Sequence, residues 1–216
     1  MYLAIEGVIG VGKTTLARLL QPIFDANLLL EVFEENPFLS SFYADRQRYA
    51  FQTQIFFLLS RYRQQHQAVP QFLASGKVLI ADYTFEKDAL FAQINLQGDE
   101  LETYQRVYEA LAEKIPSPQL VVLLRAEVEV LMQRIALRDR PYERNMERNY
   151  IEQLCAAYDR HFIENRRPGS PSVLVVDTNH LDYIRNPQDL NNVVDRIRQA
   201  LRLSPFQAEL PLHVEE

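Results

Sequence analysis

Five short apolar runs alternate with longer amphipathic segments along this chain. The runs are rich in Val, Leu and Ile, which is typical of strands in a parallel sheet covered on both faces. They lie at residues 2–5, 28–32, 78–81, 120–124 and 173–176. Helical periodicity is found between them, at about 13–24, 46–74, 86–94, 99–115, 127–138, 145–166 and 187–203. The alternation predicts an α/β fold with a five-stranded parallel sheet flanked by helices.

The pattern contains no internal repeat and no low-complexity linker, so one domain is expected over residues 1–203. The segment RRPGSP, residues 166–171, is interpreted as a loop before the last strand. After residue 203 two prolines and an acidic end interrupt the pattern. Residues 204–216 are therefore predicted to form a C-terminal tail.

Composition and charge narrow the classes of partner. The chain has 216 residues, of which 47% are hydrophobic and 24% charged, so it can bury a full core. A net charge of −6 disfavours a broad surface for nucleic acid or acidic lipid. The single cysteine, Cys155, allows no internal disulfide and is interpreted as a packing residue. With no long apolar stretch and no basic leader, we expect a cytoplasmic protein that does not associate with membranes.

The first apolar run leads into a glycine-rich segment, GVIGVGKT, that matches the pattern G-x-x-x-x-G-K-[ST]. Glycines let backbone N–H groups turn inward around an anion, and the following helix adds its positive end. The lysine can reach the terminal phosphates, and the threonine hydroxyl can bind Mg²⁺. A chance match of four specified positions arises on the order of 1% of the time in such a chain. The predicted ATP-binding residues are Gly7, Gly10, Gly12, Lys13, Thr14 and Thr15.

Two acidic residues lie at the C-terminal ends of predicted strands, at the sheet edge where α/β proteins bind ligands. Glu31 ends the second run and begins the segment EVFEENP. A carboxylate there could accept a hydroxyl proton, although a solvated acidic loop fits the spacing as well. Asp82 ends the third run, where P-loop proteins place a carboxylate that handles Mg²⁺. It could instead cap the next helix.

Four arginines stand within eleven residues, from Arg134 to Arg144. Arg134 and Arg138 are four apart on one helix face, where like charges repel unless an anion binds between them. Pro141 is predicted to end the helix, which leaves Arg138 and Arg140 in a lid that could clamp phosphates. A solvated basic face is the alternative.

Several segments together resemble the deoxynucleoside kinase family, and most of all its bacterial branch acting on deoxyguanosine and deoxyadenosine. They are EGVIGVGKTT, the E-x-x-E-E-N-P segment, FYADRQRYAFQTQIFFLLSRYRQ, IADYTFEKDALFA and RDRPYERNMERNYIEQL. They occur in family order over about residues 3–165, whereas the last strand and helix carry no sharp motif. The resemblance implies a P-loop kinase fold, ATP as phosphoryl donor, Mg²⁺, and a deoxynucleoside as acceptor.

The resemblance also implies residue roles. Glu31 corresponds to the general base that takes the proton of the nucleoside 5′-hydroxyl. Tyr43 and Glu143 correspond to the residues that hold the sugar 3′-hydroxyl. The implied phosphate-handling residues are Lys13, Arg134, Arg138 and Arg140, and the implied metal-side residues are Thr14 and Asp82.

Recognition of the base is implied for three further residues. Gln54 resembles the residue that hydrogen-bonds the base edge, and Arg61 and Asp88 resemble a pair that favours purines. Gln54 and Arg61 are seven residues apart, so two helical turns bring them to one face. Polar groups on this aromatic-rich helix need partners, which a nucleobase could supply with Phe85 or Phe91 stacking nearby. On the helical pattern alone, a simple aromatic core with solvated polar groups fits better.

The chain departs from the family in one informative place. Most members follow the strand-end acid with arginine, whereas here the sequence is Asp82-Tyr83-Thr84, which removes a cation from beside the acceptor hydroxyl. The guanine-preferring bacterial branch resembles this sequence in carrying Asp-Tyr, so Tyr83 stays among the predicted substrate-binding residues. Gln54 resembles the amide of many adenine- and pyrimidine-accepting members, which leaves the base preference open. Val32 replaces a proline and should change loop stiffness.

The sequence thus predicts transfer of the ATP γ-phosphoryl group to the 5′-hydroxyl of deoxyguanosine or deoxyadenosine, in nucleotide salvage. A nucleoside monophosphate kinase would need extra cations near Glu31, where the loop is acidic. A non-catalytic structural relative would tend to lose Lys13 or Glu31. The resemblance also implies a homodimer built on the helices near 46–74 and 99–115, whose apolar stripes could equally pack within one chain.

Overall fold

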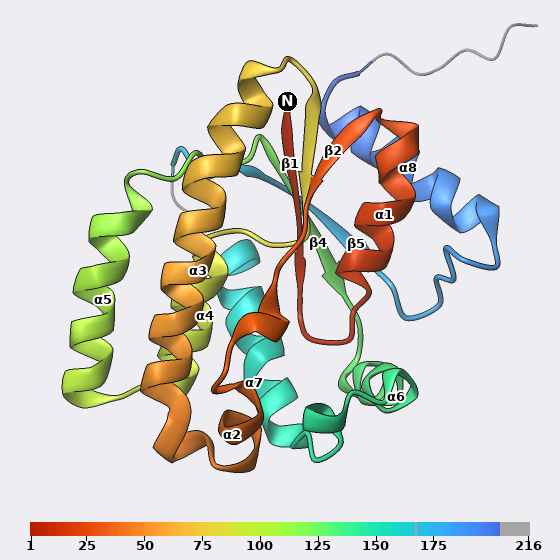
Figure 1. Cartoon of the computed structure of the whole chain (residues 1–216). Coiled ribbons are helices and arrows are strands. Elements are labelled where there is room, and N and C mark those ends of the chain that lie inside the picture. Colours follow the sequence, from red (N-terminus) through yellow and green to blue (C-terminus); the bar gives the residue numbers. More distant parts are fainter. Residues whose placement is uncertain (167, 204–216) are drawn as a thin grey trace, which may run out of the picture.

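Five parallel strands form the sheet of the structure, a computed structural model that describes residues 1–166 and 168–203. Their bounds are Tyr2–Gly7 (β1), Ala26–Leu29 (β2), Val78–Ala81 (β3), Leu120–Arg125 (β4) and Ser172–Asp177 (β5). Across the sheet the order is β2, β3, β1, β4, β5, and every neighbouring pair is parallel (Figure 1). The predicted sheet is confirmed.

The central strands β1 and β4 are buried nearly throughout, because helices cover both faces of the sheet. All six residues of β1 and the first five of β4 are buried. In register, Ala4 of β1 lies opposite Ala81 of β3 and Val121 of β4. Burial on both faces explains why these strands have continuous apolar sequences rather than alternating ones.

The described helices follow the predicted segments closely. The one near 99–115 begins and ends slightly earlier, and the one near 145–166 passes into a π-helical turn at Arg160–Glu164. The sequence pattern did not indicate a short helix after the second strand or two 3₁₀ turns, Phe33–Glu35 and Pro141–Glu143. The helices are Lys13–Ile23 (α1), Leu39–Ala44 (α2), Arg46–Ala74 (α3), Glu86–Asn95 (α4), Gly98–Ala112 (α5), Val128–Arg138 (α6), Arg148–Asp159 (α7) and Pro187–Ala200 (α8). The predicted tail, residues 204–216, lies outside the described residues.

The helices form two layers on either side of the sheet. Figure 1 shows α3, α4, α5 and α7 on one side and α1 and α8 on the other. The longest, α3, has 29 residues and begins where the Asp45 carboxylate accepts a hydrogen bond from the Arg48 backbone N–H at 3.2 Å. Within the described residues, no helix combines the length and apolar character needed to span a bilayer.

The second strand is displaced from its predicted position. We expected it at 28–32, but β2 covers Ala26–Leu29, because its pairing with β3 starts at Ala26 opposite Val78 and ends at Leu29 opposite Ala81. The apolar residues that follow belong to the connection out of the sheet. Glu31 therefore lies in a loop just beyond the C-terminal end of the strand.

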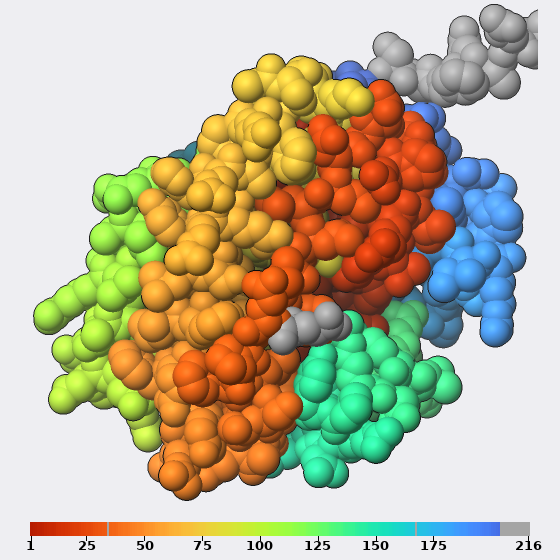
Figure 2. Space-filling view, in the orientation of Figure 1, coloured from red at the N-terminus to blue at the C-terminus, as the bar shows by residue number. Residues whose placement is uncertain are grey.

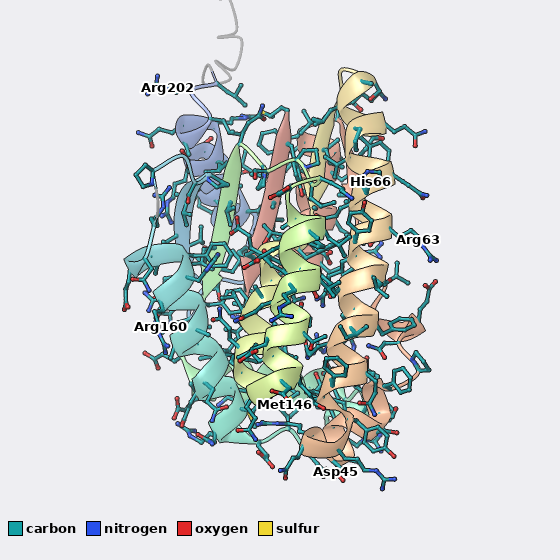
Figure 3. All side chains as sticks on the ribbon, turned by 90° about the vertical axis from the view of Figure 1, so that its left-hand side faces the viewer. Asp45, Arg63, His66, Met146, Arg160 and Arg202 are labelled. Atoms are coloured by element: carbon teal, nitrogen blue, oxygen red, sulfur yellow. The ribbon has the colours of Figure 1, made fainter. Side chains whose placement is uncertain are left out.

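The chain leaves β1 and β3 at the same edge of the sheet, at the lower end in Figure 1. Figure 3 shows Asp45 and Met146 at this end of the molecule and Arg202 at the opposite end. In doubly wound sheets the crevice beyond the carboxyl ends of the strands is where ligands bind. The glycine-rich loop and Asp82 are both placed there by the fold.

Candidate active site

A pocket at this edge gathers most of the predicted site residues. Two segments that line it, α2 and the region that follows α6, contact each other and lie at this end of the molecule (Figure 2). On its phosphate side the pocket is lined by Gly10, Lys13, Thr14, Asp82, Arg138 and Arg140. Its lining also includes Glu31, Tyr43, Gln54, Arg61 and Glu143.

The glycine-rich loop is shaped by left-handed glycines. Gly12 has φ 102° and precedes the first residue of α1, so the loop turns directly into the N-terminal end of that helix. The Lys13 ammonium donates hydrogen bonds to the carbonyls of Gly7 (2.7 Å) and Val8 (3.2 Å), which hold it inside the loop. Burial, and after it the charge of Lys87, lowers the pKa of Lys13 to about 8.

Asp82 joins the glycine-rich loop to the loop of Glu31. The Thr14 hydroxyl donates a hydrogen bond to its Oδ2 at 2.5 Å, and the Glu31 backbone N–H donates to its Oδ1 at 2.8 Å. A hydroxyl and a carboxylate side by side, facing the pocket, form a donor set that suits Mg²⁺, which binds few protein ligands and completes its shell with phosphate and water.

Glu31 is held between two cations. Arg61 donates to Oε1 through Nε at 2.9 Å and through Nη2, while the Lys87 ammonium donates to Oε2 at 2.6 Å. Burial alone would raise the pKa of Glu31, but the charges of Arg61 and Lys87 outweigh it and hold the pKa well below its usual range. The carboxylate is therefore ionised and fixed in orientation.

Arg61 also donates to Asp88 on α4, so one guanidinium bridges two carboxylates. Asp88 is fully buried; burial raises its pKa to about 6, and the Arg61 charge limits the rise. The predicted Arg61–Asp88 pair thus exists, with Asp88 behind the guanidinium that lines the pocket. The geometry links this pair directly to Glu31.

Gln54 lines the pocket and lies on the same face of α3 as Arg61, as the spacing of seven residues predicts. It is 2% exposed, and its Oε1 has no hydrogen-bond partner within the described residues. A buried amide oxygen without a partner costs free energy, so it marks a place for a ligand donor. Of the two aromatic residues considered for stacking, Phe91 lines the pocket, whereas Phe85 packs parallel to Tyr108 elsewhere.

The lid is the segment after α6, and its residue Glu143 pairs with Arg138 and Arg140. Asp139 adopts a left-handed conformation, φ 47°, and ends α6 just ahead of Pro141. Glu143 is buried, accepts a hydrogen bond from Arg138 at 2.5 Å, and lies 3.6 Å from the Arg140 guanidinium. Tyr43 stacks on Tyr142 of the lid with ring centres 5.9 Å apart, which brings α2 against it.

Six predicted site residues do not line this pocket: Gly7, Gly12, Thr15, Tyr83, Asp88 and Arg134. Tyr83 is fully buried and its hydroxyl donates to Gln64 at 2.5 Å, because the residue after Asp82 in an extended segment points to the other side. In this position Tyr83 does not line the pocket, so the structure gives no support for the expected contact between Tyr83 and the substrate. The Arg134 guanidinium donates to the carbonyl and hydroxyl of Thr178, at 2.6 and 3.0 Å, and so braces α6 against the end of β5.

Thr15 and Arg134 instead line a second cleft, on the outer side of the glycine-rich loop. Its rim carries two apolar side chains that are strongly exposed, Leu137 (86%) and Ile184 (73%). Such exposed apolar groups beside a phosphate loop are suited to a flat nucleobase. A glycine cradle, a lysine and a strand-end acid between two clefts are the features of a P-loop protein that binds a nucleoside triphosphate.

Two buried charged residues in this region were not anticipated. The sequence did not indicate Lys87, because it is one of three consecutive charged residues in the segment FEKDA, which is also typical of a solvated helix start. Glu6, fully buried on β1, accepts hydrogen bonds from the Thr84 backbone N–H (2.5 Å) and from Tyr158 (3.1 Å). An acid inside an apolar strand run was the signal for Glu6; no signal of that kind marks Lys87.

Comparison with known proteins agrees with this geometry. The chain matches the family model described as deoxynucleoside kinase over residues 3–202. It is 35% identical over 202 residues to the deoxyguanosine kinase of Bacillus subtilis (strain 168), covering 93% of this chain and 97% of the relative. It is 31% identical over 206 residues to the deoxyadenosine kinase of Dictyostelium discoideum, covering 93% and 80%. The structure of deoxyadenosine kinase from M. mycoides with bound dCTP matches with a TM-score of 0.78 at 25% identity, covering 92% and 100%.

The chain therefore belongs to the deoxynucleoside kinase family. It is a phosphotransferase with the P-loop kinase fold, as the sequence predicted. Deoxynucleoside kinase activity also decides against a non-catalytic relative and a nucleoside monophosphate kinase.

Proposed function

We propose that this protein transfers the γ-phosphoryl group of ATP to the 5′-hydroxyl of a purine 2′-deoxynucleoside, deoxyguanosine or deoxyadenosine. The main support for this proposal is that Glu31 lines one pocket together with Lys13, at the proposed phosphate side, and with Gln54, at the proposed base side. These three groups match the three parts of the reaction, the acceptor hydroxyl, the donor phosphate and the base. Relatives that are themselves deoxyguanosine and deoxyadenosine kinases support the purine assignment.

Glu31 is the general base of the proposed reaction. Its carboxylate accepts the proton of the 5′-hydroxyl while the 5′-oxygen forms a bond to the γ-phosphorus. The bond from that phosphorus to the bridging oxygen breaks, and ADP leaves with the electron pair. Lys13, Arg138 and Arg140 stabilise the charge on the moving group, which is the main catalytic contribution in phosphoryl transfer.

Mg²⁺ would be held by Thr14 and Asp82, whose oxygens are already within 2.5 Å of each other in the pocket wall. The metal would supply neutralising charge to the donor phosphates. The donor base would lie in the outer cleft, against Leu137 and Ile184, with Thr15 at the phosphate end. Arg134 serves this site as a brace through its bonds to Thr178.

The sugar would be held by Tyr43 and Glu143 through its 3′-hydroxyl. Both line the pocket, from α2 and from the lid. A 2′-hydroxyl would crowd Tyr43, whose ring is already packed against Tyr142 and Phe42. Ribonucleosides are therefore expected to be poor substrates.

The base would be read by Gln54 and by the Arg61–Asp88 pair. The unpartnered Oε1 of Gln54 can accept a hydrogen bond from a base amino or imino group. Asp88 accepts a hydrogen bond from Arg61 outside the pocket lining, while the guanidinium itself lines the pocket. Purines carry acceptors that suit such donors.

The pairing of charges at the acceptor end supports a nucleoside rather than a nucleotide acceptor. Arg61 is bound by Glu31 and Asp88, and Lys87 is bound by Glu31. A monophosphate acceptor needs cations that remain available at this end, since it brings its own two charges. The acidic loop and these pairs leave little positive charge for it.

We further propose a homodimer in the cytoplasm that works in nucleotide salvage. The proposed interface is formed by α3 and α5, which contact each other within one chain (Figure 3). Leu59 on α3 is 47% exposed and would be covered by a second copy. The mass of the protein in solution, measured by light scattering, tests this expectation.

The test of the proposed function is a radiolabelled or coupled ATP assay over the four deoxynucleosides, guanosine and dGMP. We expect phosphorylation of deoxyguanosine or deoxyadenosine, much less of the pyrimidines, and little of guanosine. Preferential phosphorylation of dGMP would overturn the acceptor assignment, and equal rates with guanosine and deoxyguanosine would overturn the sugar assignment.

A further inference from the structure

Lys87 is a buried cation with no role among the motifs of this chain. It lies in the first turn of α4 and is 6% exposed. A positive charge is unfavourable in the first turn of a helix, where the helix dipole is also positive. Burial adds a desolvation cost. Both costs indicate that a specific partner keeps Lys87 in this position.

That partner is the proposed general base. The Lys87 ammonium lies 2.6 Å from Oε2 of Glu31, on the oxygen that Arg61 does not bind. Each carboxylate oxygen therefore has its own cation, and the two contacts together fix the rotation of the carboxylate plane. With Arg61 alone, the carboxylate would be held at one oxygen only.

The local charges explain why a second cation is needed. Arg61 is shared between Glu31 and Asp88, two buried carboxylates. One guanidinium cannot neutralise both, so one carboxylate would otherwise favour its protonated form. Lys87 supplies the second charge, at the Oε2 atom of Glu31.

The position of Lys87 also relates it to the phosphate side. Lys87 and Lys13 line the same pocket and are close enough for the charge of one to affect the other. Tyr83, which directly follows Asp82, turns its hydroxyl away to Gln64 and supplies no charge here.

We propose that Lys87 is a positioning residue that fixes the orientation of Glu31 toward the acceptor hydroxyl. The inference rests on the proposed function of Glu31. It concerns Lys87 alone and can fail while that function stands.

The experiment is a double-mutant cycle on the full chain, with Lys87→Met, Glu31→Gln and the double variant, each measured with ATP and the preferred deoxynucleoside. Lys87→Met should lower kcat by about 10²-fold, similar to the loss of one preorganised donor. In the Glu31→Gln background the same change should lower kcat by less than about threefold, because residues that act as a unit are not additive. Lys87→Arg, which keeps the charge, should recover most of the rate.

The controls separate this role from simple stabilisation. Lys77→Met removes an exposed lysine ahead of β3 and should leave kcat unchanged. Lys87→Gln replaces the methionine variant if thermal unfolding shows that the latter does not fold. The inference is overturned if Lys87→Met, or Lys87→Gln in its place, keeps kcat within about twofold of the parent. It is also overturned if the loss is equal in both backgrounds, or if Lys87→Arg loses as much as the uncharged variant used. Unchanged kcat in Glu31→Gln alone would instead reject the general base, a separate outcome.

Discussion

Arg138 donates a hydrogen bond to Glu143 over 2.5 Å, which joins a residue predicted to handle phosphate to one predicted to hold the sugar. Arg140 approaches the other carboxylate oxygen at 3.6 Å. A 3′-hydroxyl bound to Glu143 would thus contact the same group that orders both arginines. Sugar recognition and phosphate handling are therefore expected to depend on each other.

The first prediction follows from this shared carboxylate. Glu143→Ala should lower kcat/KM for the preferred deoxynucleoside by about 10–100-fold, since a hydrogen bond to a charged group contributes roughly 1.5–3 kcal/mol. It should also lower kcat, because Arg138 loses its anchor. Steady-state kinetics with the deoxynucleoside and with its 2′,3′-dideoxy analogue measure both effects.

The analogue makes this prediction specific to the 3′-hydroxyl. The parent enzyme should discriminate strongly against the dideoxy compound, and Glu143→Ala should discriminate much less, with only Tyr43 left to contact the 3′-hydroxyl. Glu147→Ala removes an exposed acid of the same region and serves as the matched control. An unchanged discrimination ratio in Glu143→Ala would show that the 3′-hydroxyl binds elsewhere.

The second prediction concerns the general base. Glu31→Gln keeps the size of the side chain but removes the proton acceptor, so kcat should fall by about 10²–10⁴-fold, the usual contribution of general-base catalysis. Affinity for ATP should stay the same, because the donor residues are separate. Rapid-quench or steady-state rates together with ATP titrations provide the measurement. Glu35→Gln, an exposed acid in the same loop, is the control, and a variant with the parent kcat would remove Glu31 from the mechanism.

Local signals in the sequence were enough for the sheet and the phosphate loop. Continuous apolar runs indicated strands because β1 and β4 are buried on both faces. The glycine pattern indicated the loop because the backbone itself binds the anion. The family resemblance then brought residues as distant as Tyr43 and Glu143 to one pocket, where the structure also has them.

Contacts between distant segments could not be predicted in the same way. Lys87 meets Glu31 across 56 positions in the chain, and nothing in its local sequence distinguishes it from a solvated lysine. The direction of Tyr83 depends on how the chain leaves β3, and the bonds of Arg134 depend on where β5 ends. In each case the fold, rather than the residue type, decides between a ligand contact and a structural one.

The third prediction concerns base selectivity. Asp88→Asn keeps a similar shape but removes the charge that holds Arg61 toward the pocket. The kcat/KM for deoxyguanosine and deoxyadenosine should fall by about 10–100-fold, within the range expected for a charge-assisted hydrogen bond, and that for deoxycytidine should fall less. The measured quantity is the purine-to-pyrimidine ratio of kcat/KM. If the ratio is the same in variant and parent, the Arg61–Asp88 pair does not select purines.

The last prediction concerns the stability of the phosphate loop. Gly7 has φ +142°, and a Cβ placed on it would lie 2.4 Å from the Leu124 carbonyl oxygen and 2.9 Å from a Val11 methyl group. Since the carbonyl belongs to the neighbouring strand β4, it cannot move without breaking the sheet. Gly7→Ala should therefore destabilise the protein by at least about 3 kcal/mol, combining overpacking with backbone strain.

The matched control for Gly7 is another glycine with positive φ but open space around it. Gly76 has φ +73° and no atom within 4 Å of an added Cβ, so Gly76→Ala should cost only the backbone strain, roughly 1 kcal/mol. At this chain length the two changes should lower Tm by about 6–12 °C and about 2–4 °C respectively. Thermal unfolding followed by circular dichroism distinguishes them. Equal shifts would mean that β4 yields to the added methyl group, and that close packing against the sheet does not set the shape of the loop.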